Sequence, residues 1–106
     1  MTEAQALMVR VYLAESDHSL ERVIRALHDE IGVCGVTVLR GIEGYGSSGK
    51  LHTASLLELS LDLPLILEFF DRPEKARSAM AHIQTLIKPG HMVSWPVTVE
   101  AGENQC

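Results

Sequence analysis

Glycines, hydroxyl side chains and a lysine gather in one short stretch of the chain, and these are groups that bind anions. Four of the eight glycines fall in or beside it, in the segment Gly41-Ile42-Glu43-Gly44-Tyr45-Gly46-Ser47-Ser48-Gly49-Lys50. Backbone N–H groups at Gly44 and Gly46 could cradle an anion. The hydroxyls of Ser47 and Ser48 and the ammonium of Lys50 would add donors and one positive charge. The alternative is that the glycines only bend a hairpin, and the residues alone leave it open.

Arg40 is a candidate just before this stretch. It is expected in a strand, in phase with apolar Val38 and Ile42. A charged side chain among apolar ones needs a partner or a ligand. Glu43 is the obvious partner within the chain, and an ion pair between subunits is favoured over a phosphate contact.

The segment 88–91, Lys-Pro-Gly-His, could close over a ligand from a neighbouring subunit through Lys88, Gly90 and His91. A helix stop with solvated charges would look the same.

His52 and His91 could share a metal, but a metal site needs at least three converging ligands and the histidines have no ligand spacing. No nucleophile with its base and no carboxylate pair can be assembled from local spacing, so neither a metal site nor an enzyme is expected.

Composition sets further bounds. The 106 residues, 46% apolar and 22% charged, predict one folded domain over 1–106. A net charge of −5 without a basic segment argues against nucleic-acid binding. A secretory signal and an apolar run of about 20 residues are both lacking, so no membrane insertion is expected. Because Cys34 and Cys106 have no motif spacing, we expect no structural disulfide and a cytoplasmic location.

Two periodicities predict the elements that position these residues. Alternation of apolar residues predicts strands over 7–14, 36–43, 65–70 and 91–100, with Pro96 placing the last strand at a sheet edge. Helical spacing predicts helices over 20–31, ending at Gly32, and from the capping residue Asp71 to about residue 87. Residues 44–54 are expected to form a flexible loop, 55–60 an arm continuing its hairpin, and 101–106 a loose tail.

This βαββαβ order predicts an α+β, ferredoxin-like sandwich, a four-stranded antiparallel sheet with two helices on one face. The uncovered face would carry the apolar side chains of Met8, Tyr12, Leu39, Ile66 and Phe70. An exposed apolar face of this kind usually marks a partner surface. Self-association is therefore predicted, with three subunits facing their sheets inward as one solution.

Three segments resemble the DUF190 (UPF0166) family, which is similar to the PII-like signal proteins. They are Val-Thr-Val-Leu-Arg-Gly-Ile-Glu-Gly-Tyr-Gly at 36–46, Leu-His-Thr-Ala at 51–54 and Leu-Ser-Leu-Asp-Leu-Pro at 59–64. The resemblance covers almost all of residues 7–99. It implies a PII-like homotrimer with adenine nucleotides (AMP, ADP or ATP) bound between subunits and no obligatory cofactor. It also implies a mobile loop that engages a channel, transporter or enzyme.

Departures from the PII pattern bear on the ligand. Gly44-Tyr45-Gly46 matches the PII Gly-Phe-Gly at the loop base, but Ser47-Ser48 stand in place of Arg-Gln. The PII phosphate loop is reduced to residues 88–91, and no basic residues follow the last strand. A nucleoside monophosphate or diphosphate is therefore easier to accommodate than a triphosphate.

The function that the resemblance implies is a regulatory protein that binds a small anionic effector and acts on a partner through the loop. A ligand-independent interaction module is one alternative, and a metal-responsive trimer is a weaker one. The candidate ligand-binding residues are Arg40, Glu43, Gly44, Tyr45, Gly46, Ser47, Ser48, Lys50, His52, Lys88, Gly90 and His91.

Overall fold

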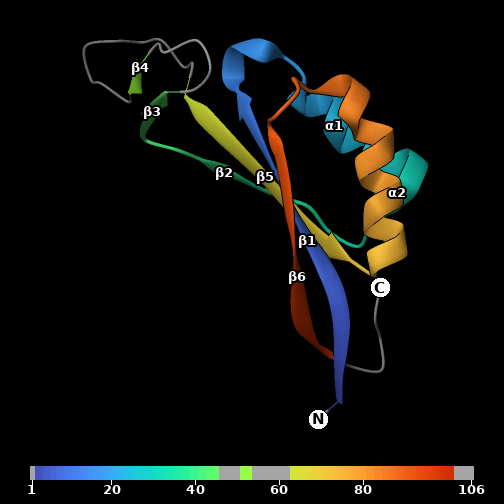
Figure 1. Ribbon diagram of the computed structural model, residues 1–106. Coiled ribbons are helices and arrows are strands. Elements are labelled where there is room, and N and C mark those ends of the chain that lie inside the picture. The colour runs from blue at the N-terminus through green and yellow to red at the C-terminus, as the bar shows by residue number, and fades with distance from the viewer. Residues whose placement is uncertain (1, 46–50, 54–62, 102–106) are drawn as a thin grey trace.

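The computed structural model describes residues 2–45, 51–53 and 63–101. The regular elements, coloured along the chain in Figure 1, are β1 (Thr2–Ala14), α1 (Leu20–Arg25), β2 (Thr37–Arg40), β3 (Glu43–Tyr45), β4 (Leu51–Thr53), β5 (Pro64–Asp71), α2 (Pro73–Ile83) and β6 (Met92–Ala101). Single 3₁₀ turns cover Glu15–Asp17 and Gln84–Leu86, and Ala26–Ile31 continues α1 as a π-helix.

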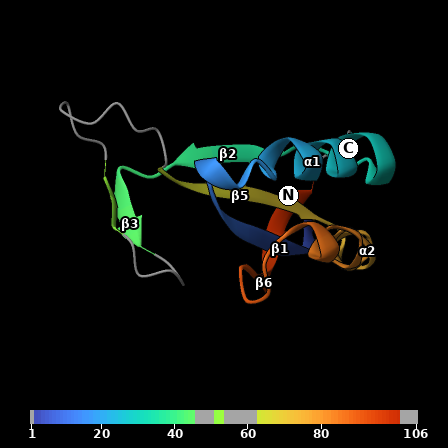
Figure 2. The same ribbon diagram turned by 90° about the horizontal axis from the view of Figure 1, so that it is seen from above.

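The main sheet is four-stranded and antiparallel, in the order β2-β5-β1-β6. Both helices lie on one face of it, and the short β3–β4 ribbon stands apart at one end (Figures 1 and 2). The predicted ferredoxin-like sandwich is therefore confirmed. So is the edge position of Pro96, because β6 is an outer strand of the sheet.

The core lies between the sheet and the helices. Alternate side chains of β1 and β5, such as Val9, Val11 and Leu67, are fully buried against α1 and α2. Fully burying an aliphatic side chain of this size contributes about 1.5–3 kcal/mol. The period-two pattern of the sequence thus fixes which face of each strand meets the helices.

The other face of the sheet is open and largely apolar, as predicted. Tyr12, Leu39 and Phe70 are 40%, 47% and 46% exposed. In their midst Arg10 pairs with Glu68, Nη2 to Oε2 at 2.6 Å, and its guanidinium lies 5.2 Å from the centre of the Trp95 ring. The Tyr12 hydroxyl and the Glu68 carboxylate raise the pKa of Arg10, so this guanidinium stays charged.

Strand β1 begins five residues earlier than predicted. Residues 2–6 pair with the end of β6, from Thr2 opposite Ala101 to Ala6 opposite Val97. Figure 1 shows the resulting ribbon running beyond the rest of the sheet toward the N-terminus. The alternation Glu3-Ala4-Gln5-Ala6 is a weak strand signal because alanine is depleted in strands. Pairing with a long partner strand overrides it.

The predicted bounds of the first helix, 20–31 with an end at Gly32, are confirmed, but its second half is of another type. It changes to π-helix after Arg25, and the N–H of Gly32 donates to the carbonyl of Leu27, five residues back, at 2.9 Å. Apolar spacing does not separate these two helix types. The second helix begins at Pro73, and Asp71 is the last residue of β5, where its Oδ1 accepts a hydrogen bond from the Arg72 N–H at 2.8 Å.

The remaining predictions concern the loop segments, the cysteines and membrane insertion. The predicted arm over 55–60 lies outside the described residues, as do residues 46–50 and 54 of the predicted loop and residues 102–106. The described residues of that loop belong to the paired strands β3 and β4. The expectation of no disulfide is wrong, because Cys34 is disulfide-bonded. Motif spacing in sequence cannot predict such a bond, since pairing depends on approach in space. No helix within the described part of the chain has the length and apolarity to cross a membrane.

Candidate functional site

A cavity of about 540 Å³ lies at the end of the main sheet nearest to the β3–β4 ribbon. One wall comes from the passage between β2 and β3 and from β3 itself, at Gly41, Glu43, Gly44 and Tyr45. The opposite wall is the segment 88–91, with the ends of β1 and β5 as the floor. Two segments more than 40 residues apart thus meet at one site.

A close contact between Gly41 and Pro64 builds the first wall. The Gly41 N–H donates to the Pro64 carbonyl at 2.7 Å, and a Cβ on Gly41 would lie 2.8 Å from Cγ of Pro64. Any larger residue at 41 would therefore displace the proline ring. The ladder between β2 and β5 ends one residue earlier, at Arg40, and pairing resumes only at Glu43 in the β3–β4 ribbon. The single strand predicted over 36–43 is therefore wrong.

The structure brings half of the predicted site residues together. Those that line the cavity are Glu43, Gly44, Tyr45, Lys88, Gly90 and His91. His52 is the register partner of Gly44 in the β3–β4 ribbon. Gly46, Ser47, Ser48 and Lys50 lie outside the described residues.

Arg40 does not line this cavity. Its Nε lies 2.8 Å from Oε1 of Glu15, so the predicted partner Glu43 is wrong. Arg40 pairs in register with the buried Leu65 and so belongs to the helix side of the sheet, where Glu15 follows β1. Glu43 belongs to the separate ribbon, beyond the break at Gly41.

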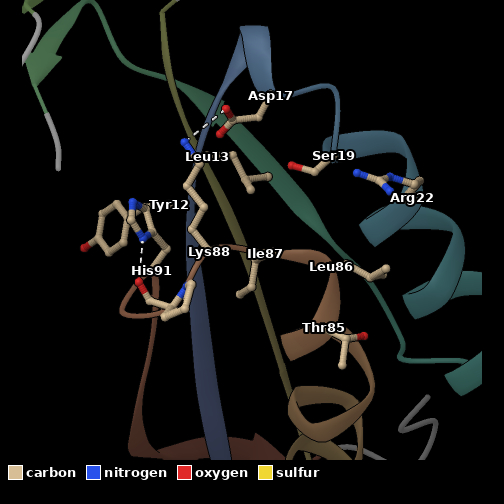
Figure 3. Close-up of a pocket in the computed structure, with 11 residues that line it drawn as sticks. Tyr12, Leu13, Asp17, Ser19, Arg22, Thr85, Leu86, Ile87, Lys88 and His91 are labelled. Carbon is tan, nitrogen blue, oxygen red and sulfur yellow. Dashed lines mark hydrogen bonds and ion pairs between the residues drawn. The ribbon is translucent and has the colours of Figure 1, made fainter. Parts of the chain in front are cut away.

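The segment 88–91 is held by its own backbone. The His91 N–H donates to the carbonyl of Lys88 at 3.3 Å, and the His91 carbonyl accepts from the Tyr12 N–H at 2.8 Å. Gly90 has φ +81°, a conformation that glycine adopts without strain. Nδ1 of His91 donates to the Pro89 carbonyl at 3.1 Å. Figure 3 shows this turn with Lys88 extending from it past Leu13.

Sequence reasoning missed Asp17 and Tyr12 as site residues. The Lys88 ammonium lies 3.5 Å from Oδ1 of Asp17, the contact drawn as a dashed line in Figure 3. Asp17 belongs to the 3₁₀ turn that follows β1. Tyr12 lies on the open sheet face but also lines the cavity. Neither position has a sequence signal for a site.

The charges around the cavity limit what it can hold. Lys88 is offset by Asp17, and Glu43 adds a second carboxylate. Each additional negative charge on a ligand would therefore be less well compensated here. The rings of Tyr12 and Tyr45, both exposed, offer faces on which a planar base can stack. Among the described residues, no group of three histidine, cysteine or acidic side chains could hold a metal ion.

Comparison with known proteins supplies a family. Residues 6–99 match the model of the DUF190 family, described as uncharacterized ACR. A UPF0166 protein from Aquifex aeolicus (strain VF5) is 33% identical over 69 residues, 65% of this chain and 70% of that protein. A UPF0166 protein from Methanocaldococcus jannaschii is 29% identical over 94 residues, 84% of this chain and 85% of that protein.

Solved structures share the fold. CPII, a nitrogen regulatory PII-like protein from Thiomonas intermedia K12 bound to ADP, AMP and bicarbonate, matches with a TM-score of 0.69 and 17% identity, over 96% of this chain and 92% of that chain. The periplasmic divalent cation tolerance protein CutA from Archaeoglobus fulgidus matches with a TM-score of 0.58 and 14% identity, over 92% and 86%. The protein has the PII-like fold, and its chain belongs to the DUF190 (UPF0166) family.

Proposed function

We propose that this protein is a non-enzymatic, PII-like regulator that binds an adenine nucleotide in the cavity between β3 and the segment 88–91. The observation that carries the proposal is the meeting of Gly44 and Tyr45 with Lys88 and His91 around one cavity of about 540 Å³. That volume lies within the range of about 300–1,000 Å³ typical of ligand pockets. The similarity in fold to CPII, which was solved with ADP and AMP, supports the choice of nucleotide.

In this proposal AMP or ADP binds more tightly than ATP. Lys88 is the cation nearest to a bound phosphate, and Asp17 already offsets its charge. A third phosphate would add negative charge beside Glu43 without gaining a cation among the described lining residues. The adenine ring would stack on Tyr12 or Tyr45.

The ligand binds between subunits of a homotrimer. Tyr12 and Ile66 line the cavity and also belong to the open sheet face, so a second subunit packed on that face would complete the cavity wall. Three open faces turned toward one another would bury Leu39, Phe70 and the other exposed apolar side chains, which supplies the driving force.

Nucleotide binding acts on a partner through the chain that follows β3. Gly44 and Tyr45 line the cavity at the start of the loop predicted over 44–54, so a ligand in contact with them is positioned to act on that loop. The partner is a membrane channel, a transporter or an enzyme, and the protein is cytoplasmic. The disulfide at Cys34 is unusual for that compartment, so thiol trapping in intact cells tests the location: a reduced Cys34 would support it and a bonded Cys34 would contradict it.

Titration calorimetry with AMP, ADP, ATP and a cyclic dinucleotide tests the proposal. We expect saturable heat with AMP and ADP, and a loss of about tenfold in affinity for Lys88→Gln, since a charge-assisted hydrogen bond is removed. Arg77→Gln, the same charge change on the exposed side of α2, should bind as the parent does. No heat with any nucleotide would contradict the proposal and favour the ligand-independent interaction module.

A further inference from the structure

A second cavity, of about 370 Å³, adjoins the candidate site on the helix side of the sheet. It lies between the tip of β1, the start of α1 and the end of α2 (Figure 3). Lys88, Asp17 and His91 line both cavities, but Ser19, Arg22 and Thr85 line only this one. These last three residues have no part in the proposed nucleotide site.

Ser19 is a buried polar residue aimed into this cavity. It is only 5% exposed, and its hydroxyl points toward the middle of the cavity in Figure 3. It immediately precedes α1, yet its side chain does not cap the helix, and the hydroxyl has no hydrogen-bond partner among the residues that the structure describes. The hydroxyl opens into the cavity, so it is free to donate a hydrogen bond to a ligand that supplies an acceptor there.

Arg22 supplies the positive charge. Its guanidinium is turned toward the same space in Figure 3, and it forms no ion pair within the described part of the chain. Lys88, the other cation, is already paired with Asp17. The cavity therefore has one uncompensated positive charge, which suits one negative charge.

The remaining wall is apolar. Leu13 is buried, and Leu86 and Ile87 are half-buried at the end of α2. We propose that this cavity binds a small organic monocarboxylate. Its carboxylate bonds to the Arg22 guanidinium and the Ser19 hydroxyl, with Thr85 as a further donor, and its apolar end packs against Leu86 and Ile87. Inorganic phosphate lacks the apolar end and adds a charge that Asp17 repels.

Ligand-observed NMR titration of the full chain with butyrate tests the proposal, with butanol and inorganic phosphate as comparison ligands. We expect saturable binding of butyrate, at least about tenfold tighter than either of the others. Arg22→Gln should weaken butyrate binding by about tenfold, Arg22→Lys by less, and Ser19→Ala by a few-fold. Arg25→Gln makes the same change about one turn further along α1, at a residue that does not line the cavity, and should have no effect.

Circular dichroism melting of each variant identifies any that fail to fold, and Arg22→Lys then replaces Arg22→Gln. Equal affinity of the parent and the folded Arg22 variants for butyrate would overturn the proposal, as would tighter binding of phosphate or butanol. ADP titration of Arg22→Gln separates the two sites. Because Arg22 does not line the nucleotide cavity, ADP affinity should stay within about twofold of the parent.

Discussion

Lys88 and Asp17 form an ion pair, Nζ to Oδ1 at 3.5 Å, where the two cavities of the molecule adjoin. Any anion that approaches Lys88 from either cavity competes with the Asp17 carboxylate. The pair is partly solvated, so its own interaction energy is about 1 kcal/mol or less. A ligand phosphate can therefore displace Asp17, but at a cost in affinity.

Replacement of Asp17 by Asn should raise the affinity for ADP by about two- to fivefold, because Lys88 no longer has a competing carboxylate. The gain should be larger for ADP than for AMP, since repulsion grows with ligand charge. Calorimetric titrations with both nucleotides measure it. Asp29→Asn, the same change in a residue paired with exposed His28, is the matched control. Weaker ADP binding by Asp17→Asn would mean that Asp17 itself contacts the ligand.

Arg40 is predicted to contribute to stability but not to nucleotide binding. Because its guanidinium is paired with Glu15 outside the candidate cavity, Arg40→Gln should leave ADP affinity within about twofold of the parent. It should lower the free energy of unfolding by about 0.5–1 kcal/mol, since Glu15 is left less well paired. Urea unfolding and nucleotide titration of the same variant measure both effects. A tenfold loss of ADP affinity with unchanged stability would make Arg40 a ligand contact after all.

The open sheet face gives a prediction about assembly. Phe70→Asp would place a carboxylate on the apolar face, and burying it unpaired in an interface costs several kcal/mol, on the order of the total stability of many assemblies. Light scattering after gel filtration should then give the monomer mass for this variant and the mass of the proposed trimer for the parent. Ser78→Asp, on the exposed side of α2, should remain trimeric. Phe70→Asp that still elutes as a trimer would place the interface on another surface.

The sheet, its helices and its open face could all be predicted from sequence, because each follows from a periodicity. Apolar residues recur every second position in each strand, as Val9 and Val11 do in β1 and Leu65 and Leu67 do in β5, and the face that they share is buried. Glycine and proline placed the turns for the same kind of reason, since Gly32 and Gly90 both have positive φ. Local backbone preferences and face patterns are properties of the sequence itself.

The pairings at the site could not be predicted in this way. Asp17 pairs with Lys88, which lies 71 residues further along the chain. Arg40 pairs with Glu15 and not with Glu43, which is nearer in sequence, because β2 ends at Arg40 and Glu43 belongs to the separate ribbon. Such contacts depend on the side of the sheet on which each loop lies, and local sequence patterns do not predict that side. The same applies to Ser19, whose hydroxyl caps no helix and faces a cavity formed by a distant segment.

Gly41 is predicted to affect both the stability of the fold and the geometry of the cavity wall. A methyl group there would lie 2.8 Å from Cγ and 3.3 Å from the carbonyl oxygen of Pro64. The proline carbonyl is fixed by the Gly41 N–H, so the strand cannot move away without losing that hydrogen bond. Gly41→Ala should therefore destabilise the fold by about 1–3 kcal/mol, as overpacked sites do, and urea unfolding measures it.

Gly35→Ala is the matched control, because nothing lies within 4 Å of a Cβ at that position, and it should be neutral or slightly stabilising. Pro64→Ala removes the ring carbon but not the carbonyl oxygen, so the double variant should recover part of the loss. Since the same contact positions the wall that carries Gly44, Gly41→Ala should also weaken ADP binding in protein that is still folded. Stability equal to that of the parent would mean that β2 and β5 are free to separate here, and that the cavity wall is not fixed by this contact.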